Sequence, residues 1–356
     1  MRILFLADAV SIHTRRWAES FRDQGHEIHV ASFRTASIDG VNVHILKNHG
    51  LGKFGYFFAV PQLRRLASMI RPDIFHAQYV TSYGFLSALA GLKPLVVTAL
   101  GTDVLISPRE SVLLRIFAGY ALKKANFVTT VAEHMNQAVQ RLGAPVHKTI
   151  AIPFGVDTDL FCFPSKPRPL IPPLRIISTR NFSPVYSVHT VIHAVHILLG
   201  RDVAVSLDLV GDGPSRPELE KLVHELGMEH NVRFHGHIDH GRLIFLLGQA
   251  HIFVSTAVSD GNNISLNEAM SCGCIPIATK IPANSQWIIH GENGFLFTSG
   301  DSDSLSASIL RAADSSNWGA IAMRNRQLVE ERADWSVCIC QMRDIYLDLM
   351  NRKSAS

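Results

Sequence analysis

Cysteine is scarce in this sequence. It has five cysteines, an odd number. Two C-x-C pairs are formed by Cys272 with Cys274 and by Cys338 with Cys340, and Cys162 stands alone. This excludes a scaffold held by disulfide bonds and is typical of reduced thiols in the cytosol. Cys272 and Cys274 have no second pair nearby in sequence, so we interpret them as small core residues rather than zinc ligands.

Long apolar runs are also lacking. The opening MRILFLAD has five apolar positions between Arg2 and Asp8, too few for a signal peptide or a membrane span, and predicts a buried strand. A long stretch without a full charge, between Asp73 and Lys93, is broken by polar residues, so we expect no transmembrane helix. With 47% hydrophobic and 18% charged residues, the composition excludes intrinsic disorder.

Basic runs interleaved with aromatic residues are absent, so no nucleic-acid partner is expected. The net charge is +4, but there are 17 Lys and Arg against 11 Asp and Glu through Cys162, and 17 against 19 after it. The basic first half favours an anionic partner, such as a phosphorylated substrate or an acidic membrane face. An ordinary solvated surface would give the same distribution.

A length of 356 residues exceeds what one hydrophobic core usually organises and predicts two domains. The segment FPSKPRPLIPPL holds five prolines, which neither a helix nor a central strand accommodates. We therefore expect a first domain over 1–162, a linker over 163–173, a second domain over 174–334, and a helix over 335–356 that crosses back to the first domain.

Short apolar runs alternate with amphipathic segments of helix length on both sides of this linker, which predicts two α/β domains with parallel, doubly wound sheets of the Rossmann-like type facing a central cleft. The expected strands of the first domain are RILFLA, EIHVAS, VNVHIL, DIFHAQ, PLVVTA, NFVTTV and KTIAIP. Those of the second are LRIIST, VSLDLV, VRFHG, AHIFVST and CIPIAT.

Residues 250–279 carry the clearest functional signal, because a buried strand runs into a polar loop, a helix and another strand. Asn262 or Asn263 is suited to the N-cap, and the helix start then offers backbone N–H groups to a phosphate or diphosphate. Asp260 and Glu268 bracket this anion site at a separation of about 10 Å, the span of a nucleotide sugar. Each carboxylate would accept hydrogen bonds from ligand hydroxyls. Alternatively, Asp260 only caps the helix and Glu268 is solvated.

The pattern D-x7-E followed by AMSCGCIP resembles the E-x7-E signature of retaining GT-B glycosyltransferases, the glycosyl transferases group 1 or family 4. Other segments resemble this family in order and spacing: RILFLADAVSIHTRRWAESFRDQGHEIHVAS, VTALGTDVL, IPFGVDTDLF, LVGDGPSRPELEKL and ANSQWIIHGENGFLF. The resemblance spans nearly the whole chain. It implies an acceptor-binding first domain and a second domain that binds the nucleotide sugar.

The resemblance also implies roles for single residues. Arg180 would contact the donor diphosphate, Asp260 the donor sugar and Glu268 the ribose, and these three form the expected catalytic set. The expected donor-binding residues are Arg180, Tyr186, Gly211, Gly213, Asp260, Gly261, Asn262, Asn263, Ile264 and Glu268. On the acceptor side we expect His13, Thr14, Arg15, His76 and Asp103. Asp103 has no acidic neighbour in sequence, so no metal site is expected. The resemblance implies a nucleotide-sugar donor as substrate and no cofactor.

Three positions depart from the family pattern. Asp260 stands where the family usually has Glu, Tyr186 where a Lys follows the Arg by six residues, and Leu100 where His often precedes the G-x-D turn. The change at Tyr186 removes one positive charge from the diphosphate site, since a phenol donates only a neutral hydrogen bond.

The glycines of VGDGPSR do not indicate a dinucleotide site. Gly211 and Gly213 are followed by Arg216 where a third glycine would be required, and Pro214 favours the start of a helix. We interpret this segment as a tight turn between a strand and a helix at the ligand cleft.

Residues 51–71, LGKFGYFFAVPQLRRLASMIR, combine aromatic side chains with Lys53, Arg64 and Arg65. Such a helix is suited to an anionic membrane surface, although a core helix with basic solvent-facing residues explains the pattern as well.

Together with the resemblance, these residues imply a cytoplasmic, metal-independent, retaining glycosyltransferase, and a peripheral position at the inner face of the membrane stays open. It would move a hexosyl or N-acetylhexosaminyl group from a UDP- or GDP-sugar to a hydroxyl of a glycan or lipid-linked acceptor in surface polysaccharide or glycolipid synthesis. A GT-B nucleotide-sugar epimerase and a non-catalytic nucleotide-sugar-binding protein are the alternatives.

Overall fold

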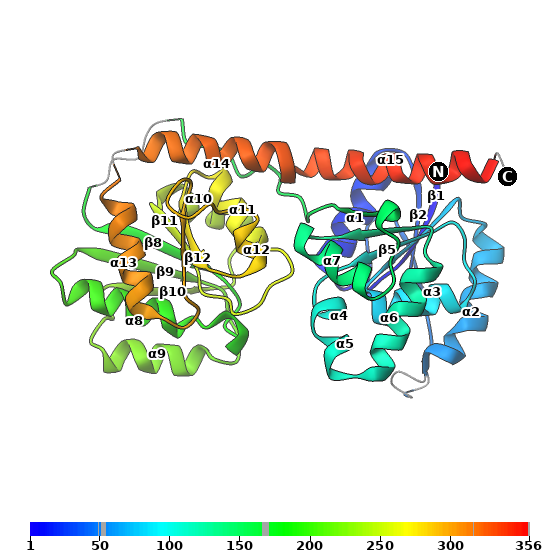
Figure 1. Cartoon of the computed structure of the whole chain (residues 1–356), viewed down its shortest axis with the longest axis horizontal. Helices are drawn as coiled ribbons and strands as arrows, with labels where there is room; N and C mark the ends of the chain where they lie inside the picture. The colour runs from blue at the N-terminus through cyan, green and yellow to red at the C-terminus, as the bar shows by residue number, and fades with distance from the viewer. Residues whose placement is uncertain (49, 51–54, 166–170, 316, 355–356) are drawn as a thin grey trace. The chain divides into compact units, whose positions relative to one another are not determined.

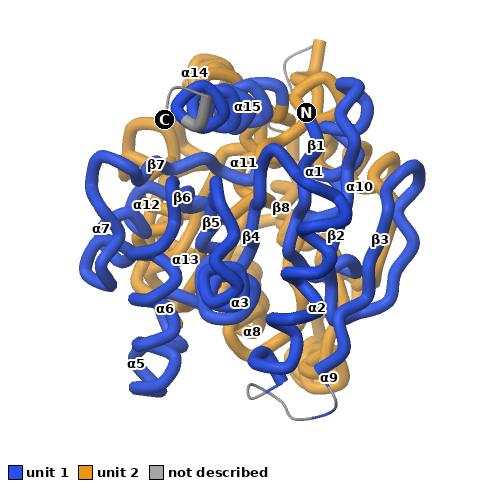
Figure 2. The backbone as a smooth tube through the Cα atoms, turned by 90° about the vertical axis from the view of Figure 1, so that its right-hand side faces the viewer, with its two compact units in different colours: residues 1–154, 336–356 blue, residues 155–335 orange. Residues whose placement is uncertain are grey.

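The computed structural model describes the chain except for residues 49, 51–54, 166–170, 316 and 355–356. It divides into two compact units, Met1–Phe154 with Ser336–Ser356 and Gly155–Trp335 (Figures 1 and 2). Each unit is a parallel sheet with helices packed on it, which confirms the predicted fold class of two Rossmann-like α/β domains. Part of the expected linker lies outside the described residues.

The sheet of unit 1 has the order β3-β2-β1-β4-β5-β6-β7, and all neighbours pair in parallel. Its strands are β1 (Arg2–Leu6), β2 (Glu27–Ser32), β3 (Asn42–Ile45), β4 (Ile74–Gln78), β5 (Leu95–Ala99), β6 (Phe127–Thr130) and β7 (Thr149–Ala151). Its helices are α1 (Ile12–Asp23), α2 (Gly55–Ile70), the π-helix η2 (Val80–Gly84), α3 (Phe85–Leu89), α4 (Thr102–Leu105), α5 (Ser107–Glu110), α6 (Val112–Lys124), α7 (Glu133–Arg141), the 3-10 turn η3 (Val146–Lys148) and α15 (Trp335–Ser354). The strand order reverses between β1 and β4.

The sheet of unit 2 has the order β10-β9-β8-β11-β12-β13 and is also parallel throughout. Its strands are β8 (Leu174–Thr179), β9 (Val205–Val210), β10 (Val232–Gly236), β11 (Ile252–Ser255), β12 (Ile275–Thr279) and β13 (Phe295–Phe297). Its helices are the 3-10 turn η4 (Pro184–Tyr186), α8 (His189–Leu199), α9 (Arg216–Glu225), α10 (His240–Gln249), α11 (Ile264–Ser271), α12 (Pro282–Ser285), α13 (Ser302–Ala313) and α14 (Trp318–Ala333). Here the order reverses between β8 and β11.

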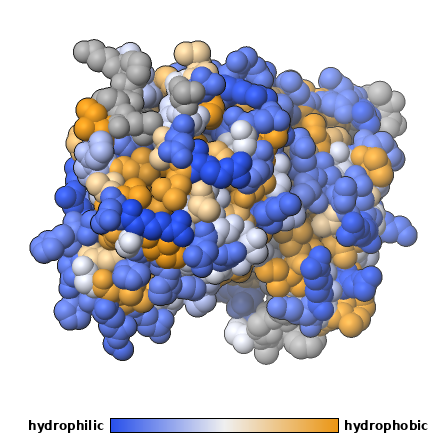
Figure 3. Space-filling model, turned by 60° about the vertical axis from the view of Figure 1, so that its left-hand side comes forward, coloured by the Kyte–Doolittle hydropathy of each residue, from blue (hydrophilic) through white to orange (hydrophobic). Residues whose placement is uncertain are grey.

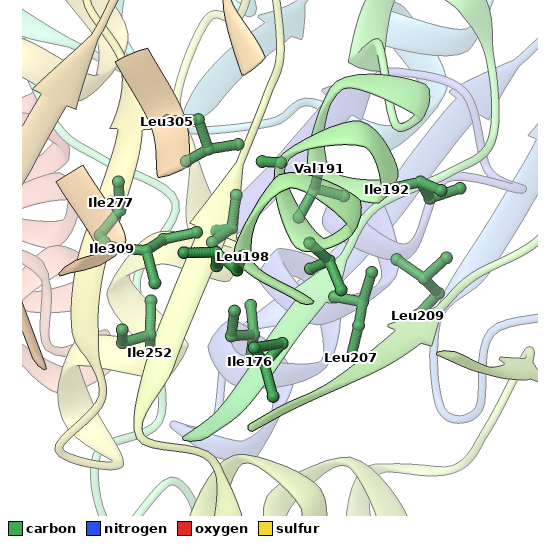
Figure 4. Packing of buried hydrophobic residues seen from close by; sticks show 14 of the residues in the cluster. Ile176, Val191, Ile192, Leu198, Leu207, Leu209, Ile252, Ile277, Leu305 and Ile309 are labelled. Carbon is green, nitrogen blue, oxygen red and sulfur yellow. The ribbon is translucent and has the colours of Figure 1, made fainter. Parts of the chain in front are cut away.

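Burial on both faces explains why the strands read as nearly continuous apolar runs. Every residue of β4, β5, β11 and β12 is buried. In unit 2, side chains of β8, β9, β11 and β12 pack against those of α8 and α13, as Figure 4 shows for Ile176, Leu207, Val191 and Leu305. This core fixes the strand ends from which the polar loops start.

The C-terminal helix α15 belongs to unit 1, whereas α14, which precedes it in the chain, belongs to unit 2. The Tyr346 side chain of α15 is fully buried against Phe21 and bonds to His76 of β4. The segment after Phe154 pairs with the end of α14 instead, because the Val156 N–H donates to the Ala333 carbonyl at 2.7 Å. The chain therefore passes between the two units twice.

Hydrophilic side chains cover much of the face drawn in Figure 3, with hydrophobic residues in separate patches among them. Within the described part of the chain, no helix is both long enough and apolar enough to cross a membrane.

Candidate active site

The predicted donor residues gather in unit 2 at the carboxyl ends of its central strands. Arg180 directly follows β8, and Ser255 ends the neighbouring strand β11. These two strands flank the point where the strand order reverses, and ligands of doubly wound sheets bind outside the strand ends at this point.

Arg180 is held on three sides. Its Nε donates a hydrogen bond to Ser255 Oγ at 3.3 Å, and one Nη forms an ion pair with the Asp260 carboxylate. The Tyr186 ring covers the guanidinium, with the ring centroid 5.0 Å from Cζ. The Arg180 and Asp260 side chains are only 9% and 14% exposed, so solvent screens this pair weakly. The sequence predicted Arg180, Tyr186 and Asp260 as donor residues but gave no sign of their mutual contacts.

The start of helix α11 is fixed by amides. Asn263 is the N-cap, as one of the two expected alternatives, and its Oδ1 accepts a hydrogen bond from the Leu266 N–H at 3.1 Å. Its Nδ2 donates to Ser255 Oγ at 3.1 Å and to Asn284 Oδ1 at 2.9 Å. Asn284 donates in turn to the Thr279 carbonyl at the end of β12. The α11 N-terminus is therefore tied to the ends of both β11 and β12.

The remaining predicted residues of this loop lie at the same helix start. Gly261 and Asn262 precede the N-cap, and Ile264 is the first residue of α11. Asn262 is 8% exposed, and neither polar atom of its side chain has a hydrogen-bond partner among the described residues. Such a group is costly to bury unless a ligand or water satisfies it. Glu268 lies half-buried one turn further along α11.

Gly211 and Gly213 let a second loop approach Arg180 closely. Their φ angles are 134° and 158°, and a Cβ on Gly211 would lie 2.1 Å from the Arg180 carbonyl oxygen. A Cβ on Gly213 would meet the Phe182 backbone at 2.8 Å. The glycines thus allow the turn after β9 to pack on the loop that carries Arg180.

In unit 1, the predicted acceptor residues His13, Thr14 and Arg15 lie in the first turn of α1, just after β1. The His13 ring stacks on Phe154 at 4.0 Å between centroids, and burial, with a smaller contribution from Arg16, lowers its pKa to about 4. Thr14 is buried and its hydroxyl donates to Gln78 Oε1 at 3.0 Å across the point where this sheet reverses its order. Arg15 is exposed.

His76 and Asp103 are buried in unit 1 and serve its internal structure. The ring nitrogens of His76 contact the Tyr346 hydroxyl at 2.5 Å and Thr98 Oγ1 at 2.6 Å, and burial lowers its pKa to about 3. The Asp103 carboxylate accepts hydrogen bonds from the backbone N–H groups of Val80, Leu100 and Gly101, while burial raises its pKa. Asp103 thus positions the loops after β4 and β5, whereas His76 links β4 to β5 and α15. Neither presents its side chain at the surface.

Sequence reasoning missed Ser255, Asn284 and Tyr346. Ser255 and Asn284 are fully buried polar residues next to strand ends, and this placement after an apolar run is the signal that could have found them. Tyr346 follows Met342 by one helical turn on the buried face of α15, but its partner is 270 residues away. No sequence spacing indicates that contact.

No group of three or more His, Cys, Asp or Glu residues that could hold a metal ion occurs in the part of the chain that the structure describes. Cys272 and Cys274 are buried in the core of unit 2, as expected, and the Cys274 thiol contacts the Leu247 carbonyl at 3.3 Å.

Two doubly wound units in one chain, the second with an arginine, a carboxylate and a capped helix start at its strand ends, define a protein of the GT-B class. The family model for glycosyl transferases group 1 matches residues 168–330, and that for glycosyl transferase 4-like proteins matches residues 2–132. Together these two matches reach into both units and support a glycosyltransferase of the group 1 type.

Named relatives support this assignment. The N-acetyl-alpha-D-glucosaminyl L-malate synthase of Bacillus anthracis is 24% identical over 350 residues, which cover 92% of this chain and 91% of that protein. The lipopolysaccharide core biosynthesis glycosyltransferase LpsD of Rhizobium meliloti is 31% identical over 151 residues, 40% of each chain. The structure of Anabaena Alr3699/HepE in complex with UDP matches with a TM-score of 0.82 at 21% identity, covering 98% of this chain and all of that one, which shows the GT-B fold.

Proposed function

We propose that this glycosyltransferase moves a hexosyl or N-acetylhexosaminyl group from a UDP- or GDP-sugar to a hydroxyl of a glycan or lipid-linked acceptor, with retention at the anomeric carbon. The observation that carries the proposal is the convergence of Arg180, Asp260 and the Asn263-capped start of α11 at the strand ends of unit 2. Retention rests on the D-x7-E signature alone. The role in surface polysaccharide or glycolipid synthesis rests on the names of relatives such as LpsD. A cytosolic location rests on the cysteine pattern alone.

The leaving diphosphate would bind between Arg180 and the first N–H groups of α11. A helix start presents unpaired N–H donors and the positive end of the helix dipole to an anion. A guanidinium has five N–H donors, and the contacts to Ser255 and Asp260 use two of them among the described residues. Neutralising the charge that develops on the diphosphate is the main contribution to rate that this site can make.

Asp260 and Glu268 would each accept hydrogen bonds from hydroxyl groups of the donor. Asp260 would contact the sugar, and Glu268 the ribose. Since Asp260 pairs with Arg180 in the free protein, donor binding would exchange part of this pair for phosphate oxygens on Arg180 and sugar hydroxyls on Asp260. The buried Asn262 amide, next to the same helix start, would gain a partner from the donor or its water.

The acceptor would bind to unit 1 near the end of β1, where His13 and Arg15 are positioned. His13 stays neutral at pH 7 because burial lowers its pKa to about 4, so one ring nitrogen can accept a hydrogen bond from an acceptor hydroxyl. Thr14 and Asp103 would hold the loops that shape this surface, and His76 would support the strand β4 beneath it.

The relatives support the choice of donor. HepE has been crystallised with UDP-glucose, and the synthase of Bacillus anthracis bears an N-acetylglucosaminyl product in its name. These are the two sugar classes of the proposal.

The test is a thermal-shift screen of UDP- and GDP-sugars, followed by transfer assays on the stabilising donor and NMR of the anomeric proton in donor and product. Transfer should persist in EDTA, because Arg180 and α11 supply the positive charge at the diphosphate. Complete loss in EDTA with rescue by magnesium or manganese would contradict metal independence. If incubation with the donor alone produces an isomerised nucleotide sugar, the protein is an epimerase. If the donor binds but is neither transferred nor hydrolysed, the protein is non-catalytic.

A further inference from the structure

Helix α6 of unit 1 exposes a row of large apolar side chains. Val112 is 76% and Ile116 61% exposed, and Leu113 and Tyr120 are exposed beside them. These four residues lie within one face of the helix, since each residue advances by about 100°. The opposite face packs into unit 1 through buried residues that include Leu114, Phe117, Ala121 and Leu122. We call Val112, Leu113, Ile116 and Tyr120 the α6 surface.

Buried aromatic rings connect helix α6 to α2 beneath the surface. Phe85 of α3 stacks on Phe117 of α6 at 3.8 Å between centroids, and it meets the Phe57 ring of α2 at 6.1 Å. Phe57 and Phe58 are about half exposed. Helices α2, α3 and α6 lie next to one another in unit 1 (Figure 2). The segment expected to meet a membrane thus contacts the same helix, α3, as α6 does. Its residues Lys53 and Phe54 lie outside the described residues.

The charges around the α6 surface have one predominant sign. Helix α6 holds Arg115, Lys123 and Lys124, all exposed, and no acidic residue. Lys124 Nζ lies 5.8 Å from the centre of the Tyr120 ring, and Arg109 of α5 is exposed just before the helix. Glu110 is the exposed acidic residue nearest in sequence.

We propose that the α6 surface binds a lipid bilayer that carries anionic headgroups. Apolar side chains flanked by basic residues are what an interfacial helix presents: the apolar groups enter the boundary between headgroups and acyl chains, and the basic groups remain at the phosphates. Ring and aliphatic side chains of this size are otherwise exposed to water at a cost.

The charge distribution argues against a second copy of the chain as the occupant. A two-fold dimer places the same patch of both copies face to face. Arg115, Lys123 and Lys124 of one copy would then approach those of the other without acidic residues of α6 to pair with them. An anionic bilayer complements the same charges.

This inference does not rest on the proposed donor site, because the α6 surface belongs to unit 1 and the donor residues to unit 2. Vesicle binding needs neither donor nor acceptor. Vesicle binding can therefore be absent in a protein that transfers sugar, and sugar transfer can be absent in a protein that binds vesicles.

The experiment is co-sedimentation of the full chain with vesicles of phosphatidylcholine, with and without phosphatidylglycerol. We expect binding to the anionic vesicles that weakens as salt rises and is lost in neutral vesicles. Ile116→Glu should reduce this binding at least tenfold, because a charge replaces an inserted apolar side chain. Lys123→Glu and Lys124→Glu should each reduce it by about fivefold or more.

Val146→Glu is the matched control. Val146 is 70% exposed in the same unit but lies in the turn η3, and its replacement should leave binding unchanged. Melting temperatures of all variants should stay close to that of the wild type, since the replaced side chains are exposed. The proposal is overturned if wild type fails to bind anionic vesicles, if Ile116→Glu binds as well as wild type, or if sedimentation velocity shows a dimer that Ile116→Glu dissociates while vesicle binding is absent.

Discussion

Asp260→Asn should change nucleotide binding and sugar transfer in opposite directions. In the free protein, the Asp260 carboxylate is paired with Arg180 in a largely buried contact. A diphosphate that binds Arg180 competes with this carboxylate for one guanidinium and is repelled by it. The amide of the variant still has an oxygen that accepts a hydrogen bond, but it is uncharged. Both the competition for Arg180 and the repulsion of the diphosphate therefore become weaker.

The expected gain in nucleotide affinity follows from Coulomb's law. Consider one charge on the Asp260 carboxylate and one on the bound diphosphate. At a separation of about 9 Å and an effective dielectric constant of about 20, they repel by about 1.8 kcal/mol. Allowing for partial screening, nucleoside diphosphate affinity should rise by about 5–20-fold, and less at high salt. Transfer should fall by about 10–100-fold, because the sugar loses a charged acceptor worth about 1.5–3 kcal/mol. The free variant should melt earlier, since Arg180 loses its ionised partner.

The assay combines calorimetry with the nucleoside diphosphate at two salt concentrations, turnover of the nucleotide sugar, and melting temperature. Glu330→Gln is the matched control, because it removes a carboxylate from Arg326 in α14 of the same unit. It should leave affinity and turnover unchanged. Equal or weaker nucleotide binding by a folded Asp260→Asn protein would refute the reasoning, as would unaltered transfer.

Three further outcomes are expected. Glu268→Ala should weaken nucleotide binding by about 10–100-fold, measured by calorimetry, because the ribose hydroxyls lose a charged acceptor. Tyr186→Lys should tighten diphosphate binding by about 1–2 kcal/mol at low salt, because a second cation joins Arg180, and should lower the melting temperature, because the ring that covers the guanidinium is lost. The free energy of unfolding should fall as pH drops from 6.5 toward 4: burial lowers the pKa of His76 to about 3 and of His13 to about 4, so both stay neutral in the folded protein while the unfolded chain takes up protons.

Each of these outcomes has a comparison that can contradict it. For Glu268, the glutamine variant should retain more affinity than alanine, and an unchanged dissociation constant in Glu268→Ala would remove the ribose assignment. For Tyr186, a lower melting temperature with unaltered affinity would mean that the position does not face the diphosphate. For the pH effect, His13→Phe should reduce the loss of stability between pH 6.5 and 4. If the free energy of unfolding changes with pH equally in this variant and in the wild type, His13 does not contribute to the loss.

The strands were predictable because a strand that is buried on both faces appears in the sequence as a nearly continuous apolar run. The segments EIHVAS and VSLDLV coincide with β2 and β9. Strand β13 was missed, since its three residues, Phe295–Phe297, are too few to form a recognisable run. Sequence also limited the N-cap of α11 to Asn262 or Asn263, and the structure has Asn263 at this position.

The contacts within the site were not predictable in the same way. Arg180 and Asp260 are 80 residues apart and leave different strands, so their pairing depends on β8 and β11 being neighbours. His76 had the polarity expected of a binding residue at a strand end. In the structure His76 is buried, and its partner is the Tyr346 hydroxyl, 270 residues further along the chain. The sequence around His76 does not indicate that partner.

The place of α15 has a consequence for the order of folding during synthesis. All strands of unit 1 have been made once residue 151 has been added, but Tyr346, which is fully buried in that unit, follows almost two hundred residues later in the printed sequence. Until then His76 and Phe21 lack the ring that covers them. Domains generally fold in the order in which they are made. Here unit 2 can close its core first, and the domain begun earliest is the last to be completed.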